Sequence, residues 1–279
     1  MSPMLNIAVR AARAAGRLTM RFFERVDGIK VTAKGHNDFV SDVDRAAETA
    51  IIEHLRGKYP DHAILAEESG AHAGRSKAGS QAGSQGGADE FEWLIDPLDG
   101  TTNYLHGFPQ WSISIGLRRR GRMELAVVYD PLHEELFTAE RGGGALLNDR
   151  KIRVTQRRGM EGALIGTGIP FRDHLQLKVY LPMLEAIIEN TAGVRRPGSA
   201  ALDFAYVAAG RLDGFWELGL RPWDFAAGTL LVTEAGGRVT DLAGSERYFE
   251  TGNVVAGGLK VQREMLQRLR PFLGPDLPA

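Results

Sequence analysis

Apolar side chains recur at steps of three and four residues over residues 4–24, which is the period of an amphipathic helix. A second stretch with this period follows Ser41 and ends before Pro60. Ser41 and Asp44 have the spacing of a capping box, which would begin this helix. Two helices are therefore predicted near the N-terminus. Their apolar positions are Leu5, Ala8, Ala12, Ala15, Leu18 and Phe22, and then Val43, Ala47, Ala50, Ile51 and Leu55.

Two short apolar runs have the length of buried strands and stop at acidic residues. Residues 63–66 run into Glu67, and residues 93–95 run into Asp96. Between these runs, residues 70–90 are rich in Gly, Ala and Ser and show no periodicity. This composition is typical of a mobile surface loop, so we expect weak order there.

Alternating apolar residues at 113–117, followed by apolar runs at 125–129 and 135–139, predict an antiparallel meander. Helices and strands then alternate, which predicts a layered protein of mixed α and β structure. A composition shift near residue 150 indicates an N-terminal α+β part at 1–150 and a C-terminal α/β part at 151–279. The second part is predicted to contain helices at 175–190, at 200–209 with Ser199 as the N-cap, and from an N-cap at Asp224 to Gly236, with strands at 215–218, 239–242 and 254–256.

The composition narrows the classes of function. Hydrophobic residues make up 43% of the 279 positions, and 34 Lys and Arg against 35 Asp and Glu leave a net charge of −1. This charge provides no global field for nucleic acid or an anionic membrane. No stretch approaches the roughly 18 apolar residues of a membrane span, and no signal-peptide pattern is present, so a cytoplasmic protein is expected. Without cysteine, any metal site must use oxygen or histidine ligands.

Acidic residues next to apolar runs form the candidate functional site: Glu67, Asp96, Asp99 three residues later, and Asp224. The Asp-Pro-x-Asp-Gly motif is by itself also typical of a simple turn. If these carboxylates converged without a cation, each pair about 4 Å apart would repel by roughly 4 kcal/mol at an effective dielectric near 20. Divalent cations remove this repulsion, and an all-oxygen ligand set selects Mg²⁺ or Mn²⁺ over Zn²⁺.

Gly100 and Thr101 lie where a loop is expected to turn into a short helix, so their N–H groups could bind phosphate oxygens. The Thr101 hydroxyl could orient a water on the metal, with Glu67 or Asp44 accepting the proton. A rival motif, D-x-D-G-T, belongs to phosphatases with a phosphorylated aspartate. Position 97 is Pro here, so the spacing excludes that covalent route.

Three motifs, in this order and spacing, resemble the signatures of the inositol monophosphatase family: AEESG at 66–70, WLIDPLDGTTN at 93–103 and LRPWDFAAGTLLVTEAGG at 220–237. The similarity covers nearly the whole chain and is closest to the bacterial inositol-1-monophosphatase branch, through NDFVSDVDRAAE at 37–48 and GSAALDFAYVAAGRLDGFWE at 198–217. The resemblance implies the layered αβαβα sandwich shared with fructose-1,6-bisphosphatases, with metal ions between the two parts. The segment after Glu67 is longer than the family pattern.

The resemblance also implies two or three Mg²⁺ ions, which Mn²⁺ could replace. Glu67, Asp96 and the Leu98 carbonyl would bind the first ion. Asp96, Asp99 and Asp224 would bind the second.

Further roles follow from the same resemblance. Asp44 matches an acid near a further metal, and Thr101 with Glu67 matches the pair that activates water. The implied substrate contacts place phosphate near Thr101 and ring hydroxyls near Glu217. The full predicted set of substrate-binding residues is Leu98, Asp99, Gly100, Thr101, Arg195, Gly198, Ser199, Ala200, Glu217 and Asp224.

The implied function is Mg²⁺-dependent hydrolysis of inositol 1-phosphate, or a similar polyol monophosphate, by water activated on a metal ion without a covalent intermediate. Phosphatases of fructose 1,6-bisphosphate or 3′-phosphoadenosine nucleotides share the metal motifs and are alternatives. Glu217 favours a polyol monophosphate because its carboxylate would repel a second phosphate. Many relatives are inhibited by lithium, so lithium sensitivity is expected.

An alternative of another class is a binding role, because bacterial relatives of this branch have been linked to ribosomal RNA transcription complexes. Phosphatase activity would then be secondary to binding a protein of such a complex. The resemblance also implies a homodimer. No membrane contact and no direct nucleic-acid contact are expected.

Overall fold

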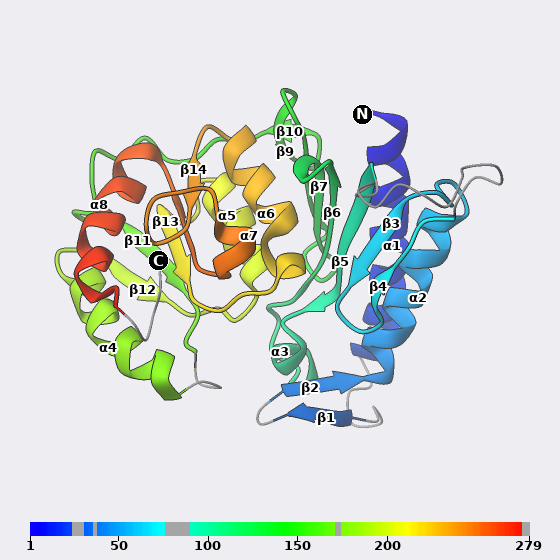
Figure 1. The fold of residues 1–279 in the computed structure, drawn as a ribbon, viewed down its shortest axis with the longest axis horizontal. Coiled ribbons are helices and arrows are strands. Elements are labelled where there is room, and N and C mark those ends of the chain that lie inside the picture. The colour runs from blue at the N-terminus through cyan, green and yellow to red at the C-terminus, as the bar shows by residue number, and fades with distance from the viewer. Residues whose placement is uncertain (24–30, 36–37, 76–89, 171–173, 275–279) are drawn as a thin grey trace, which may run out of the picture.

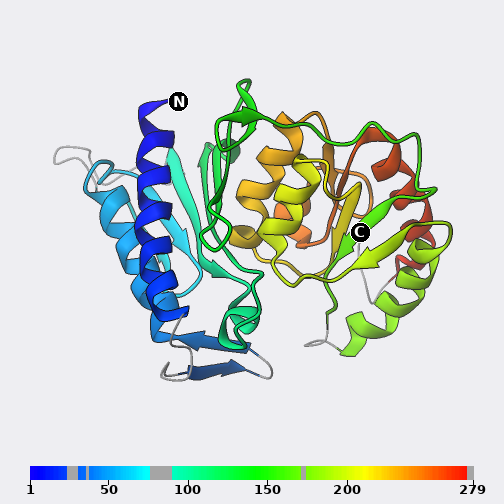
Figure 2. The same cartoon turned by 180° about the vertical axis from the view of Figure 1, so that it is seen from behind.

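Five layers of secondary structure lie side by side in the computed structural model, which describes residues 1–23, 31–35, 38–75, 90–170 and 174–274. An outer pair of helices covers an eight-stranded sheet, a central pair of helices follows, and a five-stranded sheet and a second outer pair complete the stack (Figure 1). This is the predicted αβαβα sandwich of mixed α and β structure. The same order is seen from behind in Figure 2.

The first outer layer consists of α1 (Pro3–Phe23) and α2 (Asp42–Arg56), so both predicted N-terminal helices are confirmed. Their apolar stripes pack on one face of the larger sheet, against side chains such as Ile95 and Ile115. The sequence analysis did not predict two strands that lie between these helices along the chain, β1 (Val31–Gly35) and β2 (Asp38–Ser41). They pair with each other as an antiparallel hairpin. The Ser41 side chain, predicted to cap α2, lies outside the described part of the chain.

The larger sheet contains the predicted meander and is antiparallel except for one internal pair. A loop was predicted over residues 70–90, but Gly70–His72 form an edge strand of this sheet, paired with the strand before it. Residues 76–89 lie outside the described residues. From edge to edge the strands are β10 (Arg150–Lys151), β9 (Gly144–Leu147), β8 (Glu135–Glu140), β7 (Arg122–Asp130), β6 (Ser112–Arg119), β5 (Phe91–Asp99), β3 (Ala63–Ala66) and β4 (Gly70–His72).

The second face of the larger sheet packs on the central helices α5 (Ala200–Ala208) and α6 (Pro222–Glu234). Strand alternation separates the two faces, since Leu94 and Val128 point to the central helices while Ile95 points to α1 and α2. Both central helices lie between two sheets, which explains why they are apolar on nearly every side.

The smaller sheet packs on the other side of α5 and α6. Its strand β11 is parallel to both neighbours, whereas the remaining pairs are antiparallel. From edge to edge the strands are β12 (Gly193–Arg195), β11 (Leu164–Thr167), β13 (Gly214–Glu217), β15 (Val254–Gly257) and β14 (Arg238–Thr240). The remaining helices are α3 (Thr101–Leu105), α4 (His174–Ile188), α7 (Tyr248–Thr251), α8 (Leu259–Leu269) and a 3₁₀ turn at Arg270–Phe272.

The chain leaves the larger sheet after Lys151 and enters the smaller one at Leu164. We propose that residues 1–150 and 151–279 form the two parts predicted from composition, although α5 and α6 of the second part complete the core on the larger sheet. Within the described residues, no helix has both the length and the apolarity that crossing a membrane requires.

Close packing of α5 on α6 gives a stability prediction. A Cβ at position 228 would lie 2.4 Å from the Phe204 Cβ, so Gly228→Ala should overpack the central layer. We expect the free energy of unfolding to fall by about 1–3 kcal/mol, despite the better helix propensity of Ala. Urea denaturation would measure it, with the exposed Gly274→Ala as a control that has open space around it. Equal stability of the two variants would show that this contact is not tight.

Candidate active site

A β-bulge in β5 brings Asp96 and Asp99 to one face of the larger sheet. Side chains three residues apart on a regular strand point to opposite faces. Here Asp96 pairs with Ser114 and Asp99 pairs with Ser112, so three steps on β5 match two steps on β6. The Leu98 N–H donates to Asp96 Oδ1 at 3.0 Å, inside this irregular segment. Both carboxylates therefore face the central helices.

Glu67 joins these residues because β3 and β5 are the parallel pair of the sheet. Ala66 lies beside Ile95, so Glu67, the first residue after β3, comes out beside Asp96, where β5 continues to Asp99. The Glu67 N–H continues the ladder by donating to the Ile95 carbonyl at 3.1 Å. The structure thus places Glu67 next to Asp96, as the sequence predicted from two strands ending in acids.

The N-terminus of α5 supplies partners for Asp99. The Ala201 N–H donates to Asp99 Oδ2 at 2.8 Å, and the Ser199 hydroxyl donates to the same oxygen. Ser199 is the N-cap residue, as predicted, but its side chain does not bind its own helix. The carboxylate of Asp99 takes the place of a capping side chain, and the positive end of the helix favours it there.

Asp224 lies in the first turn of α6, but it is the third helical residue, and Arg221 is the N-cap. This corrects the predicted N-cap position. The Arg221 N–H donates to Asp224 Oδ2 at 2.7 Å, which holds the carboxylate at the helix start. The charge of Asp224 reaches Asp96 on the larger sheet, so α6 and β5 contribute to one electrostatic cluster.

The cluster disfavours its own negative charge. Burial raises the pKa of Asp96 well above its usual value, and the charges of Glu67, Asp99 and Asp224 raise it further. Burial raises the pKa of Asp99 to about 6, although the hydrogen bond from Ser199 opposes this. The pKa of Asp224 is also raised well above its usual value, first by burial and then by its acidic neighbours. Ionised together, these groups need a compensating cation.

The residues present fit a hard divalent cation. All the converging side-chain donors are carboxylate oxygens, which Mg²⁺ and Mn²⁺ prefer. Among the described residues, no group of three acidic or histidine side chains is already arranged to enclose a metal ion. Mg²⁺ commonly uses one or two carboxylates and completes its shell with waters and substrate phosphate oxygens. Glu67 with Asp96 is a pair of this kind, whereas the predicted second set, Asp96, Asp99 and Asp224, would have to draw together around an ion.

The loop after β5 positions Thr101 at the start of α3, as predicted. Gly100 has φ of +92°, and a Cβ there would lie 2.9 Å from the Gln110 carbonyl oxygen, so only glycine fits. The Thr101 hydroxyl lies 3.0 Å from both Asp44 Oδ1 and the Leu98 carbonyl oxygen. With a single proton, it can donate to only one of them at a time.

Two predicted substrate residues have different surroundings. Glu217 ends β13 and lies against Gly168; a Cβ on Gly168 would lie 1.8 Å from the Glu217 Oε1 atom. The charge of Glu217 raises the pKa of Asp224, which places it within electrostatic reach of the cluster. Arg195 is exposed, and its guanidinium donates to the Val194 carbonyl at 3.1 Å. Its substrate role stays a prediction.

Gly198 and Ala200, the remaining predicted substrate residues, flank Ser199 at the start of α5. Gly198 has φ of +89° and lies close to the side chains of Asn103 and Arg196. Asn103 donates to the Pro197 carbonyl at 2.8 Å, which ties α3 to the approach of α5. Ala200, the first residue of α5, is buried beside Ser199.

Sequence reasoning missed three charged residues near the cluster. Glu48 is buried on α2 and contacts the backbone after Glu67. Its spacing of four residues from Asp44 on one helix face could have indicated it. Asp203 is buried on α5 with its Oδ1 unpartnered among the described residues. Burial raises the pKa of Asp203 well above its usual value, and the charge of Arg196 opposes this rise. No sequence pattern distinguished Arg196 from Arg195.

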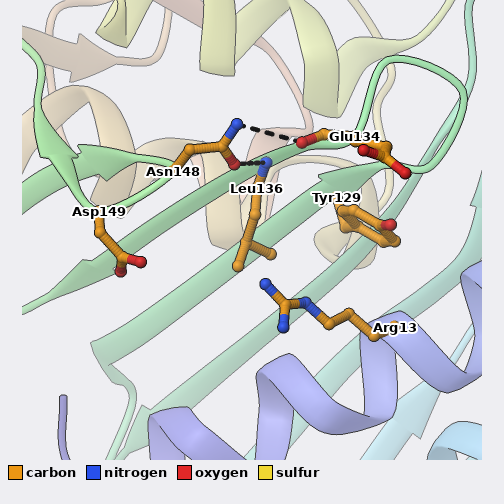
Figure 3. Close-up of a pocket in the computed structure, with 6 residues that line it drawn as sticks. All are labelled: Arg13, Tyr129, Glu134, Leu136, Asn148 and Asp149. Carbon is orange, nitrogen blue, oxygen red and sulfur yellow. Dashed lines mark hydrogen bonds between the residues drawn. The ribbon is translucent and has the colours of Figure 1, made fainter.

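A separate hollow of about 420 Å³ lies between α1 and the edge of the larger sheet (Figure 3). None of the predicted site residues lines it, and Arg13 reaches into it from α1. This hollow is therefore separate from the candidate site at the acidic cluster. The lining residues are Arg13, Tyr129, Glu134, Leu136, Asn148 and Asp149.

Comparison with known proteins identifies the family of the chain. The model of the inositol monophosphatase family matches residues 1–273. The Nus factor SuhB of Pseudomonas aeruginosa is 52% identical over 279 residues, with 99% of each chain covered. This relative confirms the predicted similarity to a bacterial branch.

Two solved structures show the same fold. The extragenic suppressor protein suhB from Bartonella henselae is 42% identical with a TM-score of 0.89, covering 96% of this chain and 99% of that chain. An inositol monophosphatase from Anabaena is 36% identical with a TM-score of 0.81, covering 96% of this chain and 95% of that chain. The family model, the identity and the fold agree, and the chain belongs to the inositol monophosphatase family.

Proposed function

We propose that this family phosphatase is a Mg²⁺-dependent phosphomonoesterase that hydrolyses inositol 1-phosphate or a similar polyol monophosphate. The observation that carries the proposal is the convergence of Glu67, Asp96, Asp99 and Asp224: burial, together with the charges of the acidic neighbours, raises the pKa of Asp96 and of Asp224. Mg²⁺ would be held by Glu67, Asp96 and the Leu98 carbonyl at one position, and by Asp96, Asp99 and Asp224 at a second. When bound, it would supply Lewis-acid activation of water and stabilise the charge of the leaving group.

Thr101 and its partners would orient the attacking water. If the Leu98 carbonyl binds a cation, the Thr101 hydroxyl is left to donate to Asp44. Its lone pairs can then accept a hydrogen bond from the water, which orients it, and Glu67 or Asp44 can take up the water's proton as it attacks. The backbone N–H groups of Gly100 and Thr101 would bind the phosphate. Attack by water in line with the leaving group requires no covalent intermediate.

The metal assignment predicts the behaviour of Asp99→Asn. This change removes charge while keeping the shape, and the Ser199 and Ala201 donors can still bind the remaining oxygen. We expect turnover of inositol 1-phosphate to fall by more than about 100-fold. Loss of a residue that only supports a metal ligand usually lowers activity by about 10- to 100-fold, and loss of a ligand should lower it further.

Turnover with Mg²⁺, after EDTA and with added Li⁺ would test this, with circular dichroism to check the fold. EDTA should abolish wild-type turnover and Li⁺ should inhibit it. Near-normal activity of a folded Asp99→Asn variant would overturn the metal assignment.

Glu217 supports a polyol monophosphate as substrate. Its carboxylate is anchored against Gly168 at the end of β13, where it can accept hydrogen bonds from hydroxyl groups. A second phosphate at this position would be repelled. Fructose 1,6-bisphosphate and 3′-phosphoadenosine nucleotides are therefore the less favoured substrates in this proposal.

Glu217→Gln tests the substrate assignment. We expect kcat/KM for inositol 1-phosphate to fall about 10- to 100-fold, because a hydrogen bond to a charged group contributes roughly 1.5–3 kcal/mol. Activity on fructose 1,6-bisphosphate should fall less or rise. The exposed Glu185→Gln on α4 serves as a control. Equal losses on both substrates would remove Glu217 from substrate selection.

We also propose a second role, as a homodimer that binds a transcription complex. The name Nus factor, carried by the Pseudomonas aeruginosa relative, supports this role. The two roles can be separated by a change that removes charge from the acidic cluster: hydrolysis needs this charge, whereas binding through another surface would not.

A cellular test separates them. In a strain that depends on this gene, the folded Asp99→Asn variant should restore ribosomal RNA transcription if binding is the physiological role. The same strain should then show no phosphatase activity in its extract. Failure of this variant to restore transcription, with normal protein levels, would favour catalysis as the physiological role.

A further inference from the structure

Three consecutive backbone amides at the end of β3 are held from two directions. The Glu67 N–H donates to the Ile95 carbonyl of β5 at 3.1 Å. The next two N–H groups, of Glu68 and Ser69, donate to the two carboxylate oxygens of Glu48 at 2.8 Å and 2.9 Å. The backbone that carries Glu67 is thus attached both to the sheet and to α2.

Glu48 is suited to this attachment. Only 3% of it is exposed, so its hydrogen bonds form away from competing water. A carboxylate has two acceptor oxygens and no donor, which matches two adjacent N–H groups. Such hydrogen bonds to a charged group are stronger than neutral ones. An amide in the same geometry would turn its NH₂ group, a donor, toward one of the two N–H groups.

The same face of α2 also holds Thr101. Asp44 is fully buried one helical turn before Glu48, and its Oδ1 accepts the Thr101 hydroxyl. Four helical residues span about 6 Å along the axis. One rigid helix therefore sets the backbone of Glu67 with one acid and the hydroxyl of Thr101 with another.

We propose that Glu48 is a positioning residue that fixes Glu67 for cation binding and keeps its carboxylate at a constant position relative to the Thr101 hydroxyl. This inference rests on the proposed function, because it assumes that Glu67 binds the cation. Glu48 itself touches neither substrate nor cation; it acts by holding the two amides that follow Glu67. Without this attachment, the segment that carries Glu67 loses its link to α2, and the carboxylate has more freedom to leave the cluster.

Glu48→Gln tests the inference, with the exposed Glu53→Gln on the same helix as the matched control. Mn²⁺ binding to each protein would be measured by titration calorimetry, and the Mg²⁺ dependence of turnover would be measured separately. We expect Glu48→Gln to weaken Mn²⁺ binding and raise the half-saturating Mg²⁺ concentration by about 10- to 100-fold, the usual effect of removing an outer-shell partner. Saturating Mg²⁺ should restore much of kcat, and KM for the substrate should then be near normal.

Hydrogen exchange of the Glu68 and Ser69 amides would report the attachment directly, and it should be faster in Glu48→Gln alone. If this variant does not fold, Glu48→Asp, which withdraws the carboxylate by one methylene, takes its place in the same measurements. Mn²⁺ binding and Mg²⁺ dependence equal to those of Glu53→Gln would overturn the inference. A defect that saturating Mg²⁺ leaves unchanged would also overturn it, since Glu48 would then have a purely structural role.

Glu67→Gln separates this inference from the function on which it rests. If Glu67→Gln binds Mn²⁺ as tightly as the wild type, the metal assignment fails. If Glu67→Gln weakens Mn²⁺ binding and Glu48→Gln does not, the metal assignment holds and only the positioning role fails.

Discussion

Repulsion among buried carboxylates is the constraint around which this site is built. Asp96 and Asp99 are 2% and 8% exposed, and both are held near further acids on a second strand and a second helix. Folding brings these groups together at an electrostatic cost, because burial and mutual repulsion both favour their protonated forms. A divalent cation placed among the carboxylates attracts each of them and offsets their mutual repulsion. In the proposed function, a bound divalent cation would offset this repulsion and allow the cluster to stay anionic.

Two local features of the larger sheet create the cluster. The parallel pairing of β3 with β5 brings Glu67, which follows β3, beside Asp96 of β5. The bulge in β5 then turns Asp99 to the same face as Asp96. The central helices complete it from the other side. The N-terminus of α5 binds Asp99, and the first turn of α6 holds Asp224. Because the central helices pack on both sheets, the ligands are fixed by the whole layered core rather than by loops alone.

Much of this arrangement could be predicted from the sequence, and the failures have physical causes. Helices α1 and α2 were predictable because each has one buried face, and the acids at strand ends were visible because apolar runs stop there. The bulge was not predictable, since it depends on pairing with β6. Ser199 occupies the predicted N-cap position, but its hydroxyl donates a hydrogen bond to Asp99, which lies 100 residues away in the sequence. Such long-range bonds leave no local pattern. The partners of Glu48 after β3 were hidden in the same way, although its spacing from Asp44 on one face of α2 was a local signal.

The most direct test of a cation among these acids is an anomalous diffraction measurement on crystals grown with Mn²⁺. The account predicts anomalous peaks within about 2.2 Å of carboxylate oxygens of Glu67, Asp96 and Asp99, with Asp224 bound to one of the ions. Peaks only elsewhere on the protein, with these four side chains free of Mn²⁺ at saturating concentration, would contradict it.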